Sequence, residues 1–124
     1  MSVAIVRILD AYHELTRECL MPLTECTSMD SIRSGHVMLD FYSTTCGPCR
    51  AMHPVLEELA RENKDLNILK VDVTRCPAMT QQFGVTSLPT VVFLVDSQVQ
   101  EVAQGFPGKD ALKMMVKRNL HGRA

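Results

Sequence analysis

Residues 37–42 read Val-Met-Leu-Asp-Phe-Tyr, and residues 46–49 read Cys-Gly-Pro-Cys. The first stretch is an apolar run of strand length. After the second cysteine, Met52, Leu56 and Leu59 recur at the spacing of one helix face. The cysteine pair therefore lies on a strand-to-helix turn, with its second cysteine in the first turn of the helix. This context favours a redox-active dithiol over a structural disulfide or a metal-binding pair.

Apolar periodicity predicts the other elements of the chain. Helices are expected at 3–19, 27–33, 48–63, 76–83 and about 112–120, and strands at 20–25, 37–42, 67–73, 90–95 and 98–104. Alternating strands and helices imply parallel strands with crossover helices, and the last two strands imply an antiparallel hairpin. We therefore expect an α/β fold, with a central mixed sheet of four to five strands flanked by helices. An N-terminal helical extension, residues 1–19, would precede a domain at 20–124.

Single residues mark several element boundaries. Pro54 lies inside the helix expected at 48–63 and should kink it, because proline removes one backbone hydrogen bond. Thr74 is expected to cap the next short helix, and Gly84 is expected to end it in the left-handed conformation. Asp96 and Ser97 should form the turn of the hairpin.

The composition of the chain argues against several classes of protein, including nucleic-acid-binding, membrane-spanning and secreted proteins. The chain has 124 residues and a formal net charge of −1, which argues against nucleic acid as a main partner. No apolar run approaches the roughly 18 residues of a membrane span, and the N-terminus does not resemble a secretory signal. The five cysteines are irregularly spaced, unlike the disulfide framework of a secreted domain. We therefore expect a reducing compartment, the cytoplasm, and no membrane contact. The protein is also expected to be a monomer.

The positions of the two cysteines suggest different roles. Residues three apart on a helical turn have Cβ atoms about 5–6 Å apart, close enough to form a disulfide after a small adjustment. Cys46 should be the more exposed, and the unpaired N–H groups and dipole of the helix N-terminus should lower its thiol pKa. The thiolate is the attacking species, so Cys46 is the expected nucleophile, and Cys49 would resolve the mixed disulfide. Gly47 would let a substrate backbone approach closely, and Pro48 suits an early helical position.

Two other interpretations of the pair stay open at this point. One is a structural disulfide, for which no oxidising context is evident. The other is a zinc site, which needs two more ligands, with Cys76 and His53 as the candidates. Otherwise His53 is expected on the outer side of its helix, without a catalytic role.

Several stretches together resemble the thioredoxin family, over about residues 20–120. The matching segments are Leu39-Asp40-Phe41-Tyr42, Cys46-Gly47-Pro48-Cys49-Arg50 with the later Pro54, Lys70-Val71-Asp72-Val73, Phe83 to Thr90 with its Leu88-Pro89-Thr90 end, and Gly105. A lone pair of cysteines separated by two residues would be a weak signal, but this set at family spacing is specific. The resemblance implies the thioredoxin fold.

The resemblance also implies roles for residues away from the cysteines. Asp40 matches the buried aspartate that moves protons to and from the resolving cysteine, and Lys70 matches its lysine partner. A carboxylate in an apolar strand should have a raised pKa, which is compatible with that role. Pro89 matches the cis-proline opposite the dithiol. The implied substrate-binding residues are Thr45, Gly47, Pro48, Leu88, Pro89, Gly105 and Phe106.

One departure lies beside the nucleophile. The family usually has tryptophan before the first cysteine, where this chain has Thr45, and the chain contains no tryptophan. The substitution removes a large apolar surface next to Cys46. It should therefore affect the recognition of substrates and reductase more than the fold.

The resemblance implies a protein-disulfide reductase with a redox-active Cys46–Cys49 disulfide that maintains cell redox homeostasis. Disulfide-containing proteins would be its substrates. No cofactor would be bound, since electrons would come from NADPH through a thioredoxin reductase. The alternative is an interaction module of the same fold, or a specialised redox partner, whose N-terminal helix docks another protein.

Overall fold

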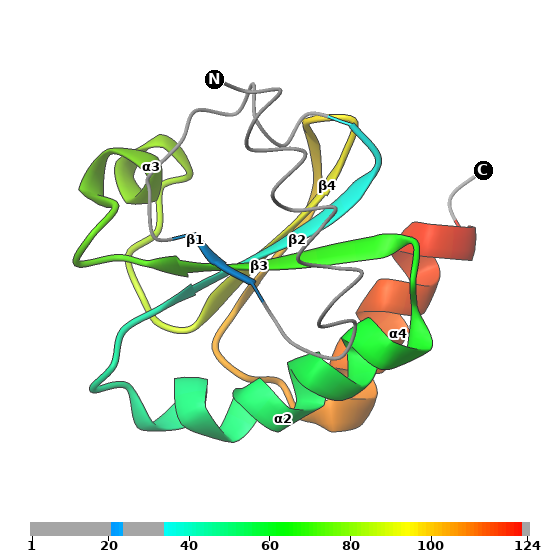
Figure 1. Cartoon of the computed structure of the whole chain (residues 1–124), viewed down its shortest axis with the longest axis horizontal. Coiled ribbons are helices and arrows are strands. Elements are labelled where there is room, and N and C mark those ends of the chain that lie inside the picture. Colours follow the sequence, from blue (N-terminus) through cyan, green and yellow to red (C-terminus); the bar gives the residue numbers. More distant parts are fainter. Residues whose placement is uncertain (1–20, 24–33, 123–124) are drawn as a thin grey trace.

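The computed structural model describes residues 21–23 and 34–122 (Figure 1). The strands are β1 (Met21–Leu23), β2 (His36–Tyr42), β3 (Leu66–Asp72), β4 (Thr90–Val95) and β5 (Gln98–Gln104). The helices are α2 (Gly47–Glu62), α3 (Pro77–Gln82) and α4 (Lys109–Lys117), and α4 continues into the π-helical turn η2 (Arg118–Gly122). Within these described ranges, no helix is long and apolar enough to cross a membrane.

The described strands form one mixed sheet of five strands in the order β1-β3-β2-β4-β5. β3 lies parallel to both β1 and β2. Helix α2 is the crossover connection between the parallel strands β2 and β3. β4 runs antiparallel to β2 and to β5. The turn between β4 and β5 places Asp96 and Ser97 at positive φ, 49° and 65°. The expected mixed sheet and its terminal hairpin are confirmed.

Helices cover both faces of the sheet and create two hydrophobic clusters. α2 and α4 lie on one face and α3 on the other (Figure 1). The first cluster joins β2, β3 and β4 to α2 and α4, through residues such as Met38, Leu56 and Leu112. The second joins the opposite sides of the same strands to α3, through residues such as Leu39 and Met79. Strands covered on both faces need nearly continuous apolar sequence, which explains the run from residue 37 to 41.

Alternation along the strands decides which side chains face α2. Successive side chains of a strand point to opposite faces. Met38 belongs to the cluster under α2 and α4, so Asp40, two residues later, faces the same side. On β3, Ile68 belongs to that cluster as well, so Lys70 also faces α2. Asp40 and Lys70 are direct partners in the register of β2 with β3.

The element bounds agree with the sequence-based expectations within one or two residues over most of the described chain. One local prediction is wrong. Cys76 is the N-cap residue of α3 and makes no side-chain capping bond, whereas the hydroxyl of Thr74 donates to Asp72 at 2.6 Å. Gly84 ends α3 at a φ of 64°, as expected. Pro54 lies inside α2, and the kink there stays a prediction. The helices expected at 3–19 and 27–33 lie outside the described residues.

Candidate active site

The two cysteines occupy the N-terminal end of α2 and are joined by a disulfide, with their Cα atoms 5.3 Å apart. Cys46 is the N-cap residue, and its sulfur accepts the backbone N–H of Cys49 at 3.2 Å. The first turn carries no acidic residue that would oppose negative charge at this sulfur. A helix N-terminus favours an anion, so the same position favours the Cys46 thiolate once the disulfide is reduced.

Cys46 is more exposed to solvent than Cys49, as expected. Cys46 is partly exposed, whereas Cys49 is only 5% exposed. Between them, Gly47 and Pro48 are exposed, and Pro48 occupies the first turn, where a missing N–H costs no hydrogen bond. A Cβ added at Gly47 would meet no atom within 4 Å. A protein partner can therefore reach Cys46, while Cys49 is largely buried.

Asp40 is a buried carboxylate beneath α2. It is 1% exposed, and neither of its oxygens has a hydrogen-bond partner in the part of the chain that the structure describes. Loss of hydration disfavours the charged form, so burial raises the pKa of Asp40 from 3.8 to about 6, although the positive charge of Lys70 opposes this. A carboxyl group with a pKa near neutrality can both accept and release a proton at physiological pH.

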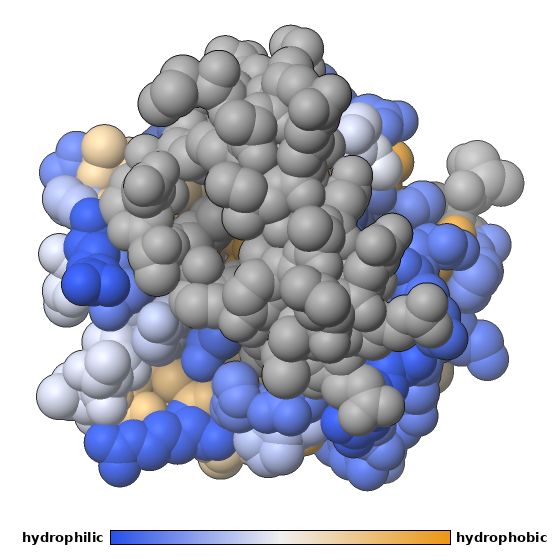
Figure 2. Space-filling view, in the orientation of Figure 1, coloured by the Kyte–Doolittle hydropathy of each residue, from blue (hydrophilic) through white to orange (hydrophobic). Residues whose placement is uncertain are grey.

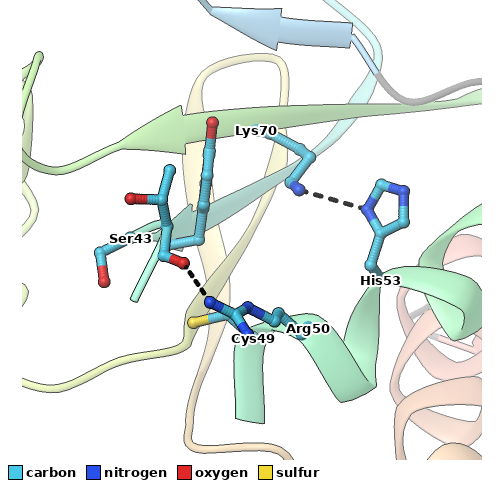
Figure 3. Close-up of a pocket in the computed structure, with 7 residues that line it drawn as sticks. Ser43, Cys49, Arg50, His53 and Lys70 are labelled. Atoms are coloured by element: carbon cyan, nitrogen blue, oxygen red, sulfur yellow. Dashed lines mark hydrogen bonds between the residues drawn. The ribbon is translucent and has the colours of Figure 1, made fainter. Parts of the chain in front are cut away.

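A pocket of about 340 Å³ opens beside the buried cysteine. Its walls are formed by Tyr42, Ser43, Thr44, Cys49, Arg50, His53 and Lys70 (Figure 3). In Figure 2 a small hydrophobic area lies above the N-terminal end of α2, with hydrophilic surface around it. The pocket connects Cys49 and Lys70 to the protein surface.

The side chain of Lys70 extends from β3 into this pocket, between Tyr42 of β2 and His53 of α2. Its ammonium group is 4.2 Å from the centre of the Tyr42 ring, a cation–π contact. It also forms a hydrogen bond to Nδ1 of His53 at 3.2 Å, drawn as a dashed line in Figure 3. The expectation that His53 lies on the outer side of its helix is therefore wrong. The sequence offered one signal that could have placed it, because His53 lies one helical turn after Cys49 and so shares its side of α2.

The other predicted binding residues cluster at the turn before β4 and the loop after β5. The Leu88–Pro89 peptide bond is cis, as the resemblance implied. The backbone N–H of Gly105 donates to the carbonyl of Pro89 at 2.7 Å, which holds the two loops together. Phe106 and Leu88 are partly buried and pack on opposite core clusters. Thr45 is exposed before Cys46, and its hydroxyl lies 3.3 Å from that of Ser43.

The zinc interpretation gains no support. No group of three or more His, Cys, Asp or Glu side chains in the described part of the chain could hold a metal ion. Zinc binds the thiolate form of cysteine, and Cys76 is disulfide-bonded, as are Cys46 and Cys49. His53 bonds to Lys70 and Glu57 instead.

Comparison with known proteins identifies the family. The model of the family described as "Thioredoxin" matches residues 23–118, which include every element from β2 to α4. The chain belongs to the thioredoxin family. A thioredoxin from Chlamydia muridarum is 41% identical over 90 residues, which cover 73% of this chain and 88% of that one. A thioredoxin from Bacillus subtilis is 42% identical over 87 residues, covering 69% and 84% respectively.

Solved thioredoxin structures share the fold. A mutant thioredoxin from Halobacterium salinarum has a TM-score of 0.74 at 31% identity, covering 82% of this chain and 90% of that chain. Plasmodium falciparum thioredoxin also has a TM-score of 0.74, at 27% identity, covering 80% and 98%.

Family membership together with the Cys46–Cys49 disulfide makes this protein a thiol–disulfide oxidoreductase, a protein-disulfide reductase. The family exchanges electrons with disulfide substrates and with a reductase. Neither the comparisons nor the described residues favour the alternative of an interaction module.

Proposed function

We propose that this protein reduces protein disulfides by a relay in which Cys46 attacks and Cys49 resolves. The observation that carries the proposal is the unequal exposure of the two bonded cysteines at the N-terminus of α2. The partly exposed sulfur can meet a substrate disulfide. The buried sulfur can react with its neighbour alone, which suits an intramolecular second step.

The relay has two balanced steps. The Cys46 thiolate attacks one sulfur of the substrate disulfide, and the other substrate sulfur leaves as a thiolate. Cys49 then gives its proton to a base and attacks the Cys46 sulfur, which releases the second substrate thiolate. Two electrons have passed from the protein to the substrate, and the Cys46–Cys49 disulfide of the present structure is the oxidised product.

Asp40 is the proposed base for the second step. It faces α2 from β2, it is buried, and its pKa of about 6 suits proton exchange near neutral pH. Lys70 supplies a positive charge that limits the rise of the Asp40 pKa, so that the carboxylate is populated when the base is needed. The pocket beside Cys49 provides a route by which the proton can reach solvent.

Substrate contacts are proposed around Cys46. The exposed Thr45, Gly47 and Pro48 would meet the substrate on the α2 side. On the other side, the backbone of Leu88 would pair with an extended substrate segment in the manner of an added strand. Pro89, Gly105 and Phe106 would complete the apolar rim.

Recycling requires an external two-electron donor. We infer that a flavoprotein thioredoxin reductase passes electrons from NADPH to the Cys46–Cys49 disulfide, and that the protein works as a monomer in the cytoplasm. Support comes from the family, since a dithiol reagent turns over only where it is re-reduced. The 41% identical chlamydial relative is described as a thioredoxin.

A coupled assay and a trapping experiment test the relay. Protein, a bacterial thioredoxin reductase, NADPH and insulin are mixed, and NADPH loss is followed at 340 nm. Wild type should turn over, and Cys46→Ser should not. Cys49→Ser should accumulate a mixed disulfide through Cys46, detected by mass spectrometry of the unreduced protein. A mixed disulfide through Cys49 in Cys46→Ser, with none in Cys49→Ser, would reverse the assigned roles.

A further inference from the structure

His53 lies in a row of side chains along one side of α2. Cys49, His53 and Glu57 are spaced four residues apart, so they follow one another on a single helix face. His53 Nε2 lies 2.6 Å from a carboxylate oxygen of Glu57, and Nδ1 lies 3.2 Å from the ammonium of Lys70. The ring therefore bridges a surface carboxylate and a lysine that faces the buried Asp40.

The two hydrogen-bond partners of His53, namely Lys70 and Glu57, determine the tautomer and the charge of its imidazole ring. An ammonium group has three donors and no acceptor, so Lys70 donates its hydrogen bond and Nδ1 accepts it. The proton of the neutral ring is then on Nε2, from which it is donated to Glu57. A neutral ring with its lone pair directed at Lys70 is the one arrangement that satisfies both contacts.

The hydrogen bond between His53 and Lys70 helps to fix the position of the Lys70 ammonium group. The ammonium is held between His53 and the face of the Tyr42 ring, and it makes no hydrogen bond to the oxygens of Asp40. Lys70 therefore acts on Asp40 through charge at a distance. The charged or titratable groups near Lys70 and His53 include Asp40 and Tyr42 from β2 and Arg50 and Glu57 from α2. Asp72 and Arg75 also interact electrostatically with Tyr42, and the guanidinium of Arg50 donates a hydrogen bond to the carbonyl of Thr44.

We propose that His53 is a positioning residue that holds the Lys70 ammonium out of contact with Asp40 and so keeps Asp40 basic enough to deprotonate Cys49. The effect on catalysis rests on the proposed role of Asp40, whereas the effect on the titration of Asp40 does not. Without the Nδ1 acceptor, the ammonium moves towards the buried carboxylate, because the attraction of opposite charges is strongest where water is excluded. The carboxylate form is then stabilised.

The decisive measurement is the titration of Asp40 itself. The side-chain carboxyl ¹³C shift of Asp40 is followed from pH 3 to 10 in the oxidised protein. His53→Leu, which fills the site without an acceptor, should lower the midpoint by about one pH unit, as expected for an opposite charge brought close. His53→Asn, whose amide oxygen stands near the place of Nδ1, should restore the wild-type midpoint. His121→Leu, an exposed histidine in η2, serves as the matched control and should leave the midpoint unchanged.

A double variant shows whether the effect passes through Lys70. Lys70→Met should raise the midpoint, and adding His53→Leu to Lys70→Met should change nothing further. An unchanged or higher midpoint in His53→Leu would overturn the proposal, and so would an equal shift in the Lys70→Met background. These results hold whether or not Asp40 is the base. If the titrations agree but the pH profile of insulin reduction in His53→Leu matches that of wild type, His53 positions Lys70 but the proposed link from that position to the deprotonation of Cys49 is refuted.

Discussion

The buried carboxylate of Asp40 should lower the free energy of unfolding at neutral pH, where the group is ionised. Asp40→Asn should remove this destabilisation. The variant replaces a group that must be desolvated as an anion by a neutral group of nearly the same size. Both oxygens of Asp40 lack a hydrogen-bond partner in the described structure, so the substitution breaks no hydrogen bond between described residues. The gain should appear only where Asp40 is ionised.

The pKa values determine the sign and size of the effect. The folded-state pKa of Asp40 is about 6, above its ordinary value of 3.8, so between these pH values the folded state binds more protons than the unfolded state. Stability therefore falls as pH rises through this window and stays reduced above it. Each pH unit of difference corresponds to roughly 1.4 kcal/mol, so the total is about 3 kcal/mol. Asp40→Asn should gain about that amount at pH 7.5 and almost nothing at pH 3.5.

Guanidinium denaturation of the oxidised protein at several pH values measures this difference. Circular dichroism at 222 nm is the suitable signal, because the chain contains no tryptophan. Asp65→Asn, at an exposed position between α2 and β3, is the matched control and should show no such pH-dependent gain. A stability difference between Asp40→Asn and wild type that is constant from pH 3.5 to 7.5 would refute the argument. So would a variant less stable than wild type at pH 7.5.

Five further substitutions, two of which serve as controls, test other parts of the molecule. Thr45→Trp should change the rate of insulin reduction more than the melting temperature, since Thr45 is exposed beside Cys46; equal kinetics of both forms would contradict this. Leu56→Ala should lower the free energy of unfolding by about 2–5 kcal/mol, because the side chain is fully buried under the sheet. Met114→Ala, at a residue that is 59% exposed, should change it by less than about 0.5 kcal/mol in the same denaturation assay. Gly84→Ala should cost about 1 kcal/mol, because its φ of 64° is strained for a residue with a Cβ. Gly47→Ala, without positive φ or nearby atoms, should be close to neutral in stability.

Much of the fold could be predicted because its signals are local. The apolar run at 37–42, the helical spacing after Cys49 and the turn at Asp96 each depend on residues adjacent in the chain, and the structure confirms all three. The error at Thr74 has a local cause as well. As an N-cap, its hydroxyl oxygen would accept a backbone N–H of the helix. Instead, the hydroxyl donates a hydrogen bond to the nearby Asp72 carboxylate.

The sequence by itself determined the reactive pair. Two cysteines flank Gly47 and Pro48 at a strand-to-helix turn, and this pattern specifies a dithiol. It also places a helix N-terminus beneath the first sulfur and buries the second sulfur. All three features follow from the local backbone of a single helical turn. Only the tertiary structure decided the surroundings of that pair. Asp40 and Lys70 become neighbours through strand register, and His53 reaches Lys70 because α2 packs over β3. Those contacts join residues from different elements, and burial and charge, which set the proton affinity of Asp40, exist only after the elements have packed.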